Sequence, residues 1–131
     1  MAKAQGVTPK TRRVVIERDS TDFHGPTCQW CGRVVDVQSG FYSLQHRRAR
    51  GMGGSRLPDT NQPQNLVLVC GSATTGCHGF IESHPHVAAE RGFRLAQSMN
   101  PAHCALVDYR GNAWWLTPDG RRVPVGPEPV F

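Results

Sequence analysis

The stretch "NLVLVCGSATTGCHGFIESH", Asn65–His84, contains the change of pattern that decides the fold. Its first part is a short apolar run that ends at Cys70, as expected for a buried strand. Small, loop-forming residues follow as far as Cys77, where a helix begins that Pro85 limits. The stretch therefore predicts a strand, a loop and a helix, with one cysteine on each side of the loop.

Two further cysteines, with two residues between them, stand in "CQWCG", residues 28–32. Such a tight turn lets two thiolates bind one ion, and structural zinc takes four ligands in a tetrahedron. The loop "GSATTG", residues 71–76, can bulge outward without separating the sulfurs on either side of it. The spacing favours one structural zinc site over two unrelated pairs of buried thiols. The predicted ligands are Cys28, Cys31, Cys70 and Cys77.

The rest of the chain predicts short elements of both kinds. Thr8 and Pro9 are an N-cap and a first helical position, and "GFYSLQH", residues 40–46, is predicted as a strand. A short strand is expected after "CQWCG", and a short helix followed by a strand is expected in residues 86–97. Residues 104–125 predict β-hairpins that turn at 110–112 and 118–120. Within them Cys104, Trp114 and Trp115 are expected in the core, and the predicted fold class is α+β.

Length and charge limit the kinds of function. The chain has 131 residues, the size of one domain, and 15 Lys and Arg against 10 Asp and Glu. A net charge of +5 favours polyanionic partners, although it also serves solubility. No apolar run approaches the roughly 20 residues that span a membrane, and the first residues lack the apolar part of a signal peptide. We therefore expect a cytoplasmic protein, where clustered cysteines more often bind metal than form disulfides.

Together these motifs resemble the HNH endonuclease family, and most closely its small zinc-bearing members from bacteriophages and bacteria. The resemblance covers residues 28–84, where the paired cysteines, a strand ending in histidine, a Gly-Gly loop, "NLVLVC" and "CH" occur in the family order. It implies a ββα-metal core, stapled by the zinc site, in which one divalent ion lies between a β-hairpin and a helix. The implied division is a basic leader and helix over 1–20, a nuclease domain over 21–92 and a hairpin extension over 93–131.

The resemblance assigns three catalytic positions. His46 matches the general base that takes a proton from the attacking water, a role that suits an imidazole titrating near ~6.5. Asn65 matches the middle residue, whose amide holds the loop and orients the base. His78 matches a metal ligand on the helix. The alternatives are a surface histidine at 46 and a zinc ligand at 78.

Two further positions bear on the catalytic ion. A second helix ligand is expected one turn after His78, which is Glu82, with His84 as the alternative. The family usually has Asp, His or Glu as a metal ligand before the base, and this chain has Gln45. An amide oxygen can bind a hard cation but lacks the charge that makes carboxylate binding strong.

The loop after His46 carries a run of arginines. We expect these side chains to contact DNA phosphates, although each could instead be a solvated surface charge. The predicted contacts are Arg47, Arg48, Arg50 and Arg56.

The resemblance thus implies a DNA endonuclease that uses Mg²⁺ or another divalent ion and either nicks or cuts both strands. A phage terminase is an implied partner. The alternative is a non-catalytic zinc-ribbon module that binds nucleic acid or protein.

Overall fold

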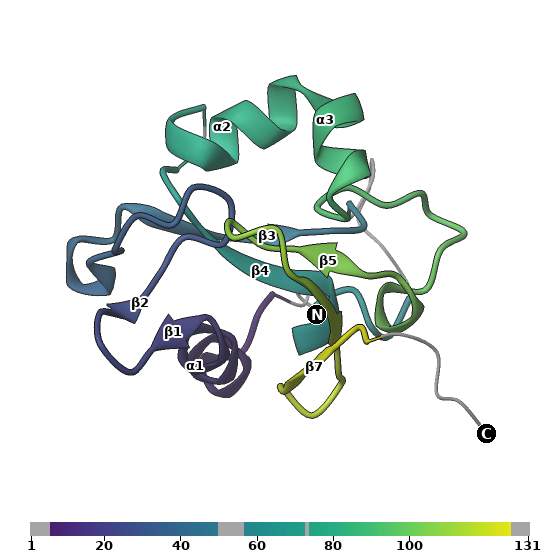
Figure 1. The fold of residues 1–131 in the computed structure, drawn as a ribbon, viewed down its shortest axis with the longest axis horizontal. Coiled ribbons are helices and arrows are strands. Elements are labelled where there is room, and N and C mark those ends of the chain that lie inside the picture. Colours follow the sequence, from purple (N-terminus) through teal and green to yellow (C-terminus); the bar gives the residue numbers. More distant parts are fainter. Residues whose placement is uncertain (1–5, 50–56, 73, 127–131) are drawn as a thin grey trace, which may run out of the picture.

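The computed structural model describes residues 6–49, 57–72 and 74–126. The fold is α+β, with helices and small antiparallel sheets (Figure 1). Its helices and strands are α1 (Pro9–Arg18), β1 (Ser20–Thr21), β2 (Gly25–Pro26), β3 (Tyr42–His46), β4 (Leu66–Cys70), α2 (Gly76–Ser83), α3 (Pro85–Glu90), β5 (Leu106–Val107), β6 (Ala113–Leu116) and β7 (Arg122–Pro124). Short 3-10 turns occur at Val37–Ser39, Pro63–Asn65 and Pro101–His103.

The β3–β4 hairpin is the centre of the fold. The two strands are antiparallel, with Tyr42 opposite Cys70 and His46 opposite Leu66. Every residue of β4 is buried, which explains why its sequence is apolar without alternation. Helix α2 packs on both strands, and Figure 1 shows α2 and α3 on one side of the hairpin and α1 on the other.

Helix α1 begins as the sequence predicts. The Thr8 hydroxyl accepts a hydrogen bond from the Thr11 amide, and Pro9 occupies the first turn. At the other end of the helix, Asp19 is buried and accepts from the Leu68 amide at 3.0 Å. The Arg18 guanidinium donates to the Leu66 carbonyl at 2.6 Å. The end of α1 therefore provides hydrogen-bond partners for backbone groups of β4 on the edge that does not pair with β3.

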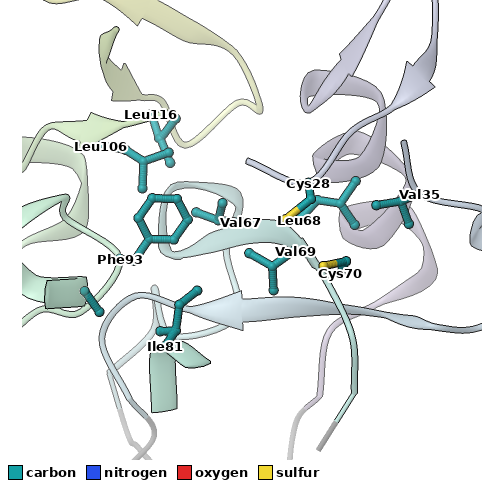
Figure 2. Packing of buried hydrophobic residues seen from close by; sticks show 11 residues of the cluster. Cys28, Val35, Val67, Leu68, Val69, Cys70, Ile81, Phe93, Leu106 and Leu116 are labelled. Carbon is teal, nitrogen blue, oxygen red and sulfur yellow. The ribbon is translucent and has the colours of Figure 1, made fainter. Parts of the chain in front are cut away.

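One hydrophobic cluster joins segments that are distant in sequence (Figure 2). Val67 and Val69 of β4 and Ile81 of α2 lie in it. Phe93, Leu106 and Leu116 lie in the same cluster, although they belong to the expected C-terminal extension. The extension thus shares its core with the β3–β4–α2 unit.

The C-terminal segment forms the predicted hairpins, in the strand order β5-β6-β7. Trp114 packs against the core and donates from its indole nitrogen to Asp108 at 2.8 Å. The prediction that Trp115 also lies in the core is wrong, because its exposed fraction is 38%. Adjacent residues of a strand point to opposite faces, so only one of the two indoles can face inward.

Two predicted strands are shorter than expected. The segment after Cys31 forms one bridge, between Thr27 and Val34, and the segment after α3 forms one bridge, between Arg48 and Leu95. No helix in the described ranges is long and apolar enough to cross a bilayer.

Candidate functional site

The four predicted cysteine ligands lie in one cluster. The sulfurs of Cys28, Cys31, Cys70 and Cys77 all lie within 4.8 Å of one another, and those of Cys31 and Cys70 are 4.0 Å apart. In a zinc tetrahedron with Zn–S bonds of ~2.3 Å, neighbouring sulfurs are about 3.8 Å apart. The cluster could therefore hold a metal ion such as zinc. Cys104 is half-buried and lies outside it.

A tight turn presents the first two sulfurs. The Cys28 amide donates to the Arg33 carbonyl, and the Gly32 amide donates back to the Cys28 carbonyl, both at 2.8 Å. Gly32 has a φ of 80°, and a Cβ there would lie 2.6 Å from the Tyr109 ring. Both the conformation and the contact require glycine at this position.

The loop before Cys77 closes on itself, as its small residues predict. Gly71 and Gly76 have φ values of 86° and 60°. A Cβ on Gly71 would lie 2.2 Å from the Thr75 carbonyl oxygen, so the two ends of the loop approach more closely than any side chain permits. This close approach brings Cys77 back to Cys70.

The protein environment alone does not favour four thiolates. Burial raises the pKa of Cys28 to about 11, and burial together with the nearby sulfur of Cys28 raises the pKa of Cys77 still further. Burial also acts to raise the pKa of Cys70, but hydrogen bonds from the Cys77 amide and the neighbouring thiols outweigh it and lower that pKa. A bound cation is what would hold all four sulfurs as thiolates.

The predicted ligands of the second ion meet between β3 and α2. Gln45 is buried, and its Oε1 lies 2.7 Å from Nδ1 of His78. The Gln45 amide nitrogen donates to Oε2 of Glu82 at 3.1 Å. His78 and Glu82 are four residues apart on α2, which puts both side chains on the face that meets β3. Arg94 also donates to Oε2 of Glu82, at 3.0 Å.

The alternative helix ligand, His84, is placed elsewhere. It follows the last residue of α2, and its ring stacks on Phe80 with centroids 4.1 Å apart. Its Nδ1 lies 3.0 Å from the Phe80 carbonyl oxygen. The geometry therefore favours Glu82 over His84.

His46, the candidate base, is the last residue of β3 and is half-buried. Its Nε2 lies 2.8 Å from Oδ1 of Asn61, a residue that the sequence did not single out. Asn61 stands among turn-forming residues between Pro58 and Pro63, and nothing in that pattern distinguishes it.

Asn65 joins two segments that follow His46 in the chain. Its side chain is fully buried, accepts from the Arg48 amide at 2.7 Å and donates to the Arg48 carbonyl at 3.0 Å. It also donates to the Thr60 carbonyl at 2.8 Å. The Asn65 amide thus ties the residues that follow β3 to the turn that carries Asn61.

The predicted DNA contacts at Arg47 and Arg48 are wrong, because both side chains are buried. Arg47 is fully enclosed, and burial lowers its pKa to about 10. Arg48 donates to the Met99 carbonyl and forms an ion pair with Asp59. Neither guanidinium is open to a phosphate. Arg50 and Arg56 lie outside the described residues.

Arg47 instead binds backbone carbonyls from distant parts of the chain. Its nitrogens donate four hydrogen bonds of 2.7–2.9 Å. The acceptors are the carbonyl oxygens of Gln64, Gly92, Pro101 and Cys104. The side chain therefore cross-links the start of β4 to the C-terminal segment.

The first turn of α2 joins the two clusters, because Cys77 and His78 are adjacent. One cluster of four sulfurs and one of imidazole, carboxylate and amide groups are thus fixed to the same short helix. No family model, curated protein or solved structure matches the chain.

Proposed function

We propose that the protein is an HNH-type endonuclease that hydrolyses DNA phosphodiester bonds and depends on a divalent metal ion. The observation that carries the proposal is the contact between Gln45 of β3 and the pair His78 and Glu82 of α2, with His46 the next residue of the strand. A strand of the hairpin and the helix that packs on it bring an amide, an imidazole and a carboxylate together, and the candidate base follows the amide in the chain, which is the residue order that the family resemblance implies. The four cysteines would hold a structural zinc ion.

In this proposal each residue of the site has a separate role. His46 accepts a proton from a water molecule, which attacks the phosphorus in line with the 3′ oxygen. His78, Glu82 and the Gln45 oxygen would hold Mg²⁺ or another divalent ion. Such an ion stabilises charge on the phosphate and on the leaving oxygen. The net charge of +5 favours association with the DNA polyanion.

The donor set fits a divalent ion, but it is weakly charged. Glu82 supplies the single carboxylate among the three groups, and it is already paired with Arg94. Hard cations bind oxygen ligands most strongly when those ligands carry charge. We therefore expect cleavage to need a higher concentration of Mg²⁺ than a site with a second carboxylate would need.

The direct test of the proposal is cleavage of supercoiled plasmid by the zinc-loaded protein. Nicked or linear product should form with Mg²⁺ or Mn²⁺ and should disappear when the divalent ion is omitted. Circular dichroism of the same samples checks that the fold is retained. Binding of DNA without cleavage under every metal condition would favour the second candidate, a zinc-bearing nucleic-acid-binding module. The neutral Gln45 is the observation that keeps this candidate open.

Replacing His46 with alanine should abolish cleavage and leave the fold and DNA binding intact. Loss of a general base typically lowers the rate by ~10²–10⁴. Initial cleavage rates and DNA binding are measured side by side, with His24→Ala as a control because His24 is an exposed histidine remote in sequence from the site. Cleavage by the His46 variant at the parental rate would remove His46 from the mechanism.

Replacing Gln45 with glutamate should tighten binding of the divalent ion. The new carboxylate keeps the length of the side chain that reaches His78, and it faces Glu82, so a cation would relieve their repulsion. Gln45→Ala should weaken binding but leave residual activity. Mn²⁺ binding followed by electron paramagnetic resonance, together with Mg²⁺ titration of cleavage, measures both effects.

The matched control is Gln38→Glu, which adds the same charge at an exposed glutamine outside the site. Identical metal titrations for the parent and both Gln45 variants would show that Gln45 is not a ligand.

A further inference from the structure

The contact between His46 and Asn61 bears on which nitrogen of the imidazole carries the hydrogen. His46 Nε2 lies 2.8 Å from Oδ1 of Asn61. A side-chain amide oxygen accepts hydrogen bonds and cannot donate them. Nε2 makes this hydrogen bond when it carries the hydrogen of the neutral His46 ring, which leaves the lone pair on Nδ1.

The acceptor is held in place by the backbone around it. The turn that contains Asn61 is closed by hydrogen bonds from the Thr60 amide to the Leu57 carbonyl and from the Gln62 amide to the Asp59 carbonyl, at 3.2 and 3.1 Å.

The carbonyl of Thr60, immediately before Asn61, accepts from the fully buried side chain of Asn65. That side chain also binds both backbone groups of Arg48, two residues after His46. Asn65 thus fixes the distance between the strand end that carries His46 and the turn that carries Asn61.

We propose that Asn61 is a positioning residue for His46: its amide oxygen holds the Nε2 hydrogen and so presents the Nδ1 lone pair to the attacking water. Asn65 acts one step further away, because it anchors the turn rather than the imidazole. This inference rests on the proposed function for its catalytic meaning, but the tautomer that it assigns to His46 is a property of the folded protein without DNA. A general base gains from such an arrangement because its orientation is fixed before the water is bound.

The tautomer is measured by nitrogen-15 NMR of the full-length, zinc-loaded protein at a pH where His46 is neutral. The His46 signals are assigned by their loss in His46→Gln. We expect a single Nε2–H form whose ring hydrogen is protected from exchange with water. Asn61→Leu should remove that protection, and Asn61→Asp, which keeps an acceptor oxygen, should retain it. An Nδ1–H form in the parent, or unchanged protection in Asn61→Leu, would overturn the proposal.

Kinetics then separates positioning from a general effect on structure. Asn61→Leu should lower kcat by about 10-fold or more, within the ~10²–10⁴ that a general base contributes, and leave KM for DNA unchanged. Asn61→Asp should recover most of the loss, and Asn112→Leu, at an exposed asparagine in another turn, should have no effect.

A parent protein that cleaves no DNA would defeat the proposed function and leave the NMR result to decide the tautomer. An active parent with an equally active Asn61→Leu would defeat this inference alone.

Discussion

Replacing Cys70 with serine is expected to leave the protein largely unfolded. Cys70 ends the buried strand β4, and its sulfur lies 4.0 Å from that of Cys31. Zinc binding by four-ligand sites contributes roughly 10–16 kcal/mol in small zinc domains. The whole free energy of unfolding of a domain is about 5–15 kcal/mol, so loss of one ligand removes a decisive part of it. Circular dichroism, thermal unfolding and the zinc content of the purified protein measure the effect.

The fifth cysteine provides the control for this experiment. Cys104 is half-buried and lies outside the cluster, so Cys104→Ser should keep one zinc ion per chain and a Tm close to that of the parent. A parent protein purified with much less than one zinc per chain would contradict the zinc assignment. So would a Cys70→Ser variant with the parental Tm.

The second large effect is expected at Arg47, where methionine should lower the free energy of unfolding by several kcal/mol. Methionine retains an unbranched side chain like the aliphatic part of arginine, but it removes all four hydrogen bonds to backbone carbonyls. A buried acceptor left without a donor costs about 1–3 kcal/mol. Urea unfolding of the parent and of Arg47→Met measures the difference in the free energy of unfolding, and the two transitions should have the same m-value.

Arg121→Met is the matched control, because the Arg121 side chain is 71% exposed and its ion pair with Asp119 lies at the surface. Its effect should stay within about 0.5 kcal/mol. Equal free energies of unfolding for Arg47→Met and Arg121→Met would contradict the prediction. They would mean that water satisfies the four carbonyls as well as the guanidinium does. Arg47→Lys should also be destabilising, because an ammonium cannot spread its donors as the planar guanidinium does.

The parts of the fold that could be predicted from sequence are those with local signals. The start of α1 follows from Thr8 and Pro9, and the return of Cys77 to Cys70 follows from the small residues between them. The contact of Gln45 with His78 and Glu82 could not be predicted from residue spacing alone. The spacing of four residues put His78 and Glu82 on one face, but their contact with β3 was implied by the family resemblance alone.

The wrong prediction of a DNA contact at Arg47 has a physical reason. A run of arginines beside glycines is typical of an exposed loop, but the residue directly after β3 is the fully buried Arg47. Its binding partners were not predictable, because they are backbone oxygens 17 to 57 residues away. Backbone acceptors leave no mark on the sequence, whereas a carboxylate partner would have suggested burial.

The same bonding pattern has an evolutionary consequence. Because every acceptor of Arg47 is a main-chain oxygen, the side chains of Gln64 and Cys104 take no part in this contact. Substitutions at those two positions need no compensating change at Arg47. At position 47 itself, no other side chain has the planar set of donors that arginine has. Among diverging relatives, position 47 would therefore stay fixed as arginine with no covarying partner, and methods that infer contacts from correlated substitutions would miss the cross-link.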